Sequence, residues 1–141
     1  MIVVPAAAVF EVLEDGARAG IKVAVILSAP PSDPDDSRRW RARLLAVAAA
    51  RGIRLLGPHS FGVIRTDVGL NATLGNTVAH PGRLALVAQS GAVCAAMLDF
   101  AASGGIGFST VVALGGAMDI GFGELLDALL FQPQTEGLLL Y

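Results

Sequence analysis

The sequence predicts an α/β fold with parallel sheets, and three features of the chain support this prediction. Short, continuous apolar runs alternate with stretches in which apolar residues recur at helical spacing. Strands of a parallel sheet are buried on both faces, so continuous apolar runs are typical of them. Hydrophobic residues make up 54% of the 141 residues and charged residues only 16%, which excludes an intrinsically disordered chain.

The first 64 residues contain three predicted strands and two predicted helices. The strands are predicted at residues 2–4, 22–27 and 53–56, and the helices at residues 6–18 and 34–51. The second helix has the clearest signals, because Asp33 supplies an N-cap, a proline occupies the first turn, and Gly52 stops the helix. Its residues Trp40, Leu44 and Val47 recur at helical spacing and form a predicted buried stripe.

The second half contains three further predicted strands and two helices. The strands are predicted at residues 84–87, 108–114 and 138–141, the helices at residues 91–102 and 122–131, and residues 65–82 are expected to form an irregular loop. A complete doubly wound domain usually has five or six strands, and this chain opens in one strand and closes in another. We therefore expect the end of one α/β domain in residues 1–66 and the start of a second in residues 67–141. A single six-stranded domain is the alternative, disfavoured because long structureless loops are uncommon.

Composition and charge exclude several classes of function. Residues 1–66 carry a formal charge of +3 and residues 67–141 a charge of -5, but the basic residues form no known nucleic-acid-binding motif, so no nucleic-acid partner is expected. The uncharged run at residues 100–118 is interrupted by glycines and polar residues, so we expect no membrane span. The N-terminus does not resemble a secretory signal, and the single cysteine excludes a disulfide framework; a cytoplasmic protein is expected.

The strongest local signal for ligand binding is an apolar strand that runs through a turn of small residues into a helix. The turn consists of Gln89, Ser90, Gly91 and Ala92. Small residues leave the first backbone N–H groups of the helix open, and the helix dipole favours an anion there. A phosphate or carboxylate site is the functional interpretation. The alternative is that Ser90 only caps the helix.

Other candidate residues give weaker signals. The outline around Ser90 resembles a nucleophile elbow, but His59 and His80 both precede it, whereas the α/β-hydrolase order requires the histidine last. His59 follows a predicted strand directly, where ligands of open α/β sheets bind. Four arginines near residue 40 resemble a phosphate patch, but the spacing of Asp35, Arg39 and Arg43 favours a solvated helix face with ordinary ion pairs. No metal-ligand spacing is present.

Several motifs in fixed order resemble one known family. They are VILSA (25–29), LLGPHSFGV (55–63), GLNAT (69–73), PGRLALVAQSGA (81–92), IGFS (106–109) and residues 119–130. Together they cover essentially the whole chain and resemble the NDP-forming acyl-CoA synthetases, relatives of the succinyl-CoA synthetase α subunit. The resemblance is closest to the branch fused to a GNAT acetyltransferase domain, the bacterial protein lysine acetyltransferases.

The resemblance implies a Rossmann-like CoA-binding domain, of which residues 1–66 are the second half, followed by the first half of a flavodoxin-like ligase domain. It implies CoA or acyl-CoA contacts from Val4, Pro5, Leu27, Ser28, Ala29, His59 and Ser60, and an anion site at Gln89, Ser90, Gly91 and Ala92. The family's glycine-rich CoA-phosphate loop and its phosphohistidine match no residue here, so no catalytic residue is expected in this chain. ATP or ADP with Mg²⁺, an ATP-grasp-type domain, a GNAT domain and a homo-oligomer are implied for the whole protein.

Two departures from the family pattern leave two functions open. Ala29 leads into Pro30-Pro31 where the family commonly has a glycine and an acid, and His59 stands where the family usually has an asparagine. Asparagine offers a donor and an acceptor together, whereas histidine offers one of each only when neutral. The first hypothesis is a module of an acyl-CoA synthetase, such as an acetate–CoA ligase, that works through a phosphohistidine. The alternative is a non-catalytic acyl-CoA-sensing module that regulates an attached acetyltransferase.

Overall fold

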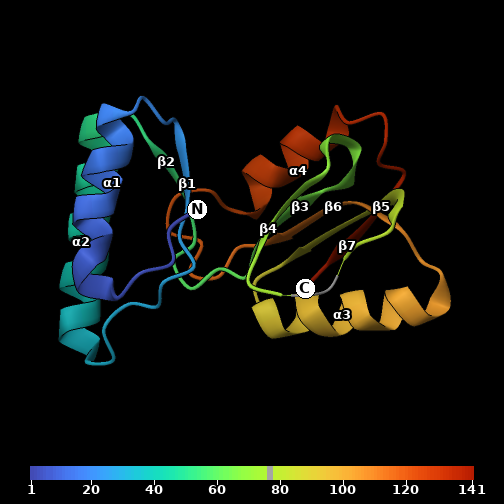
Figure 1. Cartoon of the computed structure of the whole chain (residues 1–141), viewed down its shortest axis with the longest axis horizontal. Helices are drawn as coiled ribbons and strands as arrows, with labels where there is room; N and C mark the ends of the chain where they lie inside the picture. The colour runs from blue at the N-terminus through green and yellow to red at the C-terminus, as the bar shows by residue number, and fades with distance from the viewer. Residues whose placement is uncertain (76–77) are drawn as a thin grey trace.

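The computed structural model describes residues 1–75 and 78–141, which form two separate β-sheets lying side by side (Figure 1). In chain order the elements are the 3₁₀ helix η1 (Ala6–Ala8), α1 (Val9–Arg18), β1 (Val23–Val25), α2 (Pro34–Arg51), β2 (Arg54–Leu56), β3 (Gly62–Arg65), the 3₁₀ helix η2 (Thr66–Val68), β4 (Leu70–Thr73), β5 (Pro81–Ala88), α3 (Gly91–Gly104), β6 (Phe108–Ala113), α4 (Phe122–Leu130) and β7 (Gly137–Leu140). We call residues 1–61 the first lobe and residues 62–141 the second lobe.

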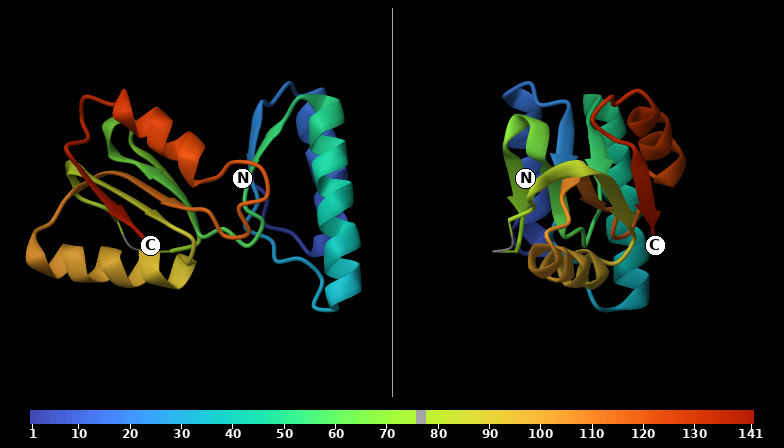
Figure 2. Two further views of the ribbon diagram at one scale, coloured as in Figure 1. Left: turned by 180° about the vertical axis from the view of Figure 1, so that it is seen from behind. Right: turned by 90° about the vertical axis from the view of Figure 1, so that its right-hand side faces the viewer.

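The first lobe contains a small parallel sheet of β1 and β2, which Ile2 extends by a single bridge to Ile26. Helices α1 and α2 cover the face of this sheet that points away from the second lobe (Figure 2). Leu13, Ile26 and Leu44 are fully buried between the helices and the sheet. The predicted strand at residues 2–4 is therefore reduced to one bridging residue, while the other elements predicted in this lobe are confirmed.

Helix α2 shows how local signals set its ends. The Oδ1 atom of Asp33 accepts hydrogen bonds from the N–H groups of Asp35 and Asp36, each at 2.9 Å, which satisfies two donors of the first turn. Gly52 ends the helix in the left-handed region, at φ 65°. Of the predicted stripe, Trp40 and Leu44 are buried and Val47 is half-buried.

The second lobe contains a five-stranded sheet in the order β4-β3-β6-β5-β7. Strands β6, β5 and β7 run parallel, and β3 pairs antiparallel with both β6 and β4. Helix α3 covers one face of the sheet and α4 covers the other (Figure 1). Strand β6 is buried along its whole length between them, including its polar residues Ser109 and Thr110. The α/β fold class with parallel sheets is confirmed, with an antiparallel pair of strands at one edge.

The prediction of an irregular loop over residues 65–82 is wrong in its first part. Strands β3 and β4 form a hairpin there, and β4 is an edge strand with only exposed or half-buried residues, so it lacks an apolar run. Residues 62–65, which we assigned to the first unit from the sequence, hydrogen-bond in the second sheet. Because the chain forms two sheets, the alternative of one six-stranded domain is also wrong. Within the described residues no helix is both long enough and apolar enough to cross a membrane.

Candidate functional site

Two loops contact each other where the lobes meet, one after β2 and one after β6. The N–H of Gly116 donates to the carbonyl oxygen of Pro58 at 2.7 Å, and the N–H of Met118 donates to that of Gly57 at 3.3 Å. The N–H of Ile120 donates to the carbonyl oxygen of Leu55 at 3.1 Å. Both loops follow the carboxyl ends of strands, where open α/β sheets place their ligands.

Gly115 allows the two loops to approach this closely. Its φ is 57°, and a Cβ atom there would lie 2.5 Å from the carbonyl oxygens of both Pro58 and His59. Side-chain-bearing residues rarely adopt this backbone conformation, and no side chain fits the space. His59 itself has a φ of 56°, one of two non-glycine residues at positive φ among those described.

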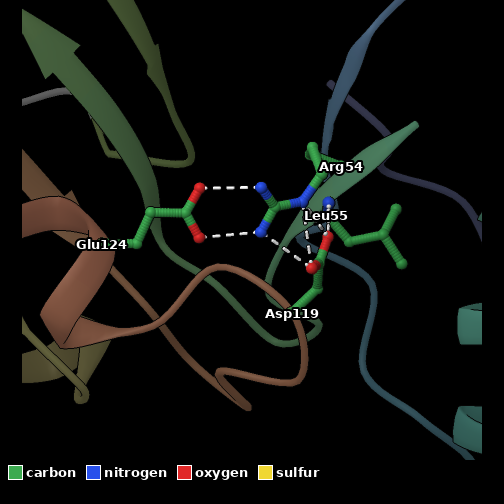
Figure 3. A network of polar contacts seen from close by, with 4 residues as sticks. All are labelled: Arg54, Leu55, Asp119 and Glu124. Atoms are coloured by element: carbon green, nitrogen blue, oxygen red, sulfur yellow. Dashed lines mark hydrogen bonds and ion pairs between the residues drawn. The ribbon is translucent and has the colours of Figure 1, made fainter. Parts of the chain in front are cut away.

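A charged network connects β2 of the first lobe with Asp119 in the loop after β6 and with α4 (Figure 3). Arg54 on β2 donates from Nε to both carboxylate oxygens of Asp119 at 3.0 Å, and from Nη1 and Nη2 to Glu124 on α4 at 2.8 and 2.7 Å. Asp119 also accepts the backbone N–H of Leu55 at 2.7 Å. One carboxylate therefore holds both a side chain and a backbone group of the first lobe.

The network changes the acidity of its members. Hydrogen bonds to Glu124 and then Asp119 raise the pKa of Arg54 above its ordinary value. The hydrogen bond from Arg54, aided by the N–H of Leu55 and opposed by desolvation, lowers the pKa of Asp119. Both groups are thus held in their charged forms at neutral pH.

A cavity of about 510 Å³ lies between the lobes beside these loops. Its lining comes from α2, the loop after β2, the start of α3 and the loop after β6. The lining residues are Arg41, His59, Ser60, Phe61, Leu74, Gln89, Ser90, Gly91, Ala92, Gly115 and Gly116. The structure therefore brings together two groups of predicted residues that lie about 30 positions apart in the sequence, His59 with Ser60 and residues 89–92.

The other predicted CoA-site residues are not part of the lining of this cavity. The hydroxyl of Ser28 donates to the carbonyl oxygen of Val4 at 2.6 Å and accepts the N–H of Val4 at 3.1 Å. The N–H of His59 donates to the carbonyl oxygen of Ser28 at 3.0 Å. Leu27 is buried, whereas Pro5 and Ala29 are exposed. Val4 and Ser28 thus support the backbone of His59.

The hydroxyl groups of Ser60 and Ser90 both have partners within the chain. The hydroxyl of Ser60 donates to the carbonyl oxygen of Ala113 and accepts the N–H of Gly62 at 2.9 Å. The Oγ of Ser90 accepts the N–H of Val93 at 3.4 Å, as a helix cap does. The capping interpretation of Ser90 therefore describes its side chain, while Gly91 and Ala92 line the cavity.

Sequence reasoning missed three features of the site. Arg41 was assigned to a solvated helix face, yet it lines the cavity. The ion pairs of α2 join Arg38 to Asp35 and Arg39 to Asp36, three residues apart, rather than at the expected spacing of four. The Arg54–Asp119 contact joins residues 65 positions apart, so no local pattern signals it. In the described part of the chain, no group of three or more His, Cys, Asp or Glu residues is placed to hold a metal ion.

We predict that replacement of Gly91 with valine weakens phosphate binding at the start of α3. A Cβ atom at residue 91 would lie 2.7 Å from the Cβ of Phe61, so a branched side chain must displace the helix start or fill the cavity. Phosphate titration followed by NMR should give an affinity for Gly91→Val at least about tenfold below that of the unmodified chain. Gly123→Val is the matched control, because Gly123 lies in the first turn of α4 with no atom within 4 Å of its Cβ position.

The same titration separates capping from binding at Ser90. Ser90→Ala should lower the free energy of unfolding by about 0.5–2 kcal/mol, because the N–H of Val93 loses its acceptor. Equal phosphate affinities for the unmodified chain, Ser90→Ala and Gly91→Val would show that this turn has only a structural role.

The chain resembles known proteins over its whole length. Residues 81–141 match the model of the succinyl-CoA ligase like flavodoxin domain. The chain is 38% identical over 142 residues to the alpha subunit of ADP-forming acetate–CoA ligase I from Pyrococcus furiosus, covering all of this chain and 31% of that protein. It is 36% identical over 141 residues to the ADP-forming acetate–CoA ligase of Methanocaldococcus jannaschii, of which it covers 20%.

The fold of the chain is also similar to that of a solved structure. The dinucleotide forming acetyl-coenzyme A synthetase 1 of Candidatus Korarchaeum cryptofilum, in its apo form, superposes with a TM-score of 0.93 at 31% identity, over 99% of this chain and 30% of that one. The chain thus spans less than a third of the length of each of these proteins. Residues 81–141 are thus similar to a succinyl-CoA ligase like flavodoxin domain, and the chain from end to end is similar to ADP-forming acetate–CoA ligases.

Proposed function

We propose that this chain forms the CoA- or acyl-CoA-binding part of an NDP-forming acyl-CoA synthetase of the acetate–CoA ligase type. The observation that supports it best is the cavity between the lobes, where His59 and the start of α3 face a common space. The relatives named as acetate–CoA ligases supply the reaction class. In this proposal the first lobe belongs to the CoA-binding domain and the second lobe to the ligase domain, so the boundary lies near residue 61 rather than at residue 66 as expected from the sequence.

The rest of the reaction belongs to parts of the protein beyond these residues. We propose that a phosphohistidine, an ATP-grasp-type domain and ATP or ADP with Mg²⁺ act there, in a homo-oligomeric protein. The Korarchaeum synthetase, to which 99% of this chain is structurally similar, has a solved complex with phosphate and ADP. Residues of this chain would contribute a binding surface and its orientation, and no catalytic side chain.

The test of this proposal is a titration of the chain with CoA. Ala92 lines the cavity, and Ala96 lies one helical turn further along α3, where it is exposed. Ala92→Glu and Ala96→Glu add the same charge, but only the first adds it to the cavity. Because a carboxylate close to bound phosphate costs about 1–4 kcal/mol, CoA affinity should fall at least about tenfold for Ala92→Glu and stay unchanged for Ala96→Glu. Absence of CoA binding, or equal losses in both variants, would contradict the proposal.

The second candidate function is an acyl-CoA-sensing module that regulates an attached GNAT-type acetyltransferase. It draws support from His59, whose exposed side chain stands at the cavity where the resembling family usually has an asparagine. The whole protein that carries this chain should be incubated with ATP labelled in the γ-phosphate. Acid-labile, base-stable labelling supports the ligase, whereas unlabelled protein with acyl-CoA-dependent acetyl transfer supports the sensor.

A further inference from the structure

The guanidinium group of Arg41 reaches from α2 of the first lobe to the second-lobe wall of the cavity. A Cβ atom placed on Gly116 would lie 2.7 Å from its Nη1 atom, so the end of the side chain lies directly against the loop after β6. Arg41 also lines the cavity, and it is half-buried. Its charge is therefore positioned at the inner surface of the cavity and not on the open face of the helix.

Arg41 stands apart from the other arginines in its partners. Seven arginines form ion pairs with carboxylates, namely Arg18, Arg38, Arg39, Arg51, Arg54, Arg65 and Arg83. Arg43 lies over the ring of Phe10, with its Cζ atom 4.1 Å from the ring centre. Within residues 1–75 and 78–141, Arg41 forms no ion pair with any acidic residue.

The cavity itself offers no counter-charge. None of the described residues that line it is acidic, and His59 is the only other lining residue that can carry a positive charge. A cation that is partly withdrawn from water without a partner is costly, and an anion from outside the chain removes that cost. Guanidinium presents several N–H donors in a fixed fork that matches the oxygens of phosphate and carboxylate.

We propose that Arg41 binds an oxyanion of the ligand in this cavity and so determines which ligands the cavity accepts. The oxyanion is a phosphate or a carboxylate, since both present paired oxygens to the fork. This inference rests on the proposed function for the identity of the whole ligand, but the oxyanion contact stands on the geometry of Arg41 alone.

The experiment compares the unmodified chain with Arg41→Gln, Arg41→Lys and Arg38→Gln in titrations with inorganic phosphate and with acetate. Arg38 is the matched control, because it lies on the same helix, carries the same charge and is paired with Asp35 on the exposed face. Arg41→Gln should raise the dissociation constant of the favoured anion about tenfold, as loss of a charge-assisted hydrogen bond does. Arg41→Lys should give a dissociation constant between those of the unmodified chain and Arg41→Gln, because lysine keeps the positive charge but lacks the forked N–H donors of the guanidinium group. Arg38→Gln should change the dissociation constant less than about twofold.

Titrations with the two anions, together with the CoA titration described above, distinguish the possible outcomes. Dependence on Arg41 for phosphate alone assigns a phosphoryl group to this position, and dependence for acetate assigns the acyl carboxylate. Equal effects of Arg41→Gln and Arg38→Gln, or no binding of either anion, would overturn the inference. Binding of an anion through Arg41 with no CoA binding would contradict only the proposed function. CoA binding that responds to Ala92→Glu, with neither anion sensitive to Arg41→Gln, would overturn only the role of Arg41.

Discussion

Gly115→Ala is expected to lower the free energy of unfolding by about 3 kcal/mol, from the combined cost of overpacking and a left-handed backbone. The new Cβ atom would lie 2.5 Å from two carbonyl oxygens of the loop after β2, and backbone atoms there cannot rotate away. The loops must separate, which also breaks the hydrogen bond from Gly116 to Pro58. Chemical denaturation measures the stability, and phosphate titration measures the accompanying loss of the cavity.

Gly105→Ala is the matched control for this prediction. Gly105 has a φ of 67° at the end of α3, close to the 57° of Gly115, but nothing lies within 4 Å of its Cβ position. Gly105→Ala should therefore lower the free energy of unfolding only by the cost of an alanine in the left-handed region, about 1 kcal/mol. If both variants lose the same stability, the close approach of the two loops contributes nothing measurable.

Asp119→Ala is expected to lower the free energy of unfolding by about 2 kcal/mol, because its removal leaves the N–H of Leu55 without its acceptor and Arg54 with one partner fewer. The carboxylate joins the two lobes, so its loss should also speed amide exchange at Met118 and Ile120, whose N–H groups donate to Gly57 and Leu55 of the first lobe. Asp67→Ala removes an ion pair that lies within the second lobe and should leave these amides unchanged.

The lowered pKa of Asp119 also predicts how stability depends on pH. In the unfolded chain this carboxyl group has an ordinary pKa of about 3.9, so the unfolded state binds a proton more readily than the folded state. The stability from the carboxylate is complete above that value and is lost as the pH falls through the lower pKa of the folded state. Asp119→Asn should remove this part of the acid dependence. An unchanged acid limb in denaturation curves of Asp119→Asn would show that other carboxylates carry it.

Some features of the fold could be read from residues close together in the chain. The ends of α2 follow from Asp33 and Gly52, and the start of α3 follows from Ser90, because each cap acts on backbone groups within a few residues. The buried strand β6 contains an apolar run at residues 111–113, although its buried Ser109 and Thr110 are polar. Strand β4 does not, because an edge strand that buries little has no reason to be apolar.

The family resemblance also came from the sequence, since several motifs in a fixed order define it. The candidate site could be predicted only in halves, as His59 with Ser60 and as the turn from Gln89 to Ala92. Nothing in either segment indicates that they face one cavity, because their meeting depends on how the two sheets dock.

The sequence by itself determined the α/β class, the main helices and strands and the two separate candidate segments, because these depend on periodicity, caps and apolar runs along the chain. Only the tertiary structure decided that Gly115 fits against Pro58, that Arg54 binds Asp119 across 65 positions, and that Arg41 turns its charge into the cavity. The physical reason is that these contacts join residues far apart in the chain. No local sequence pattern signals such a contact, and only the packing of the two lobes brings the residues together.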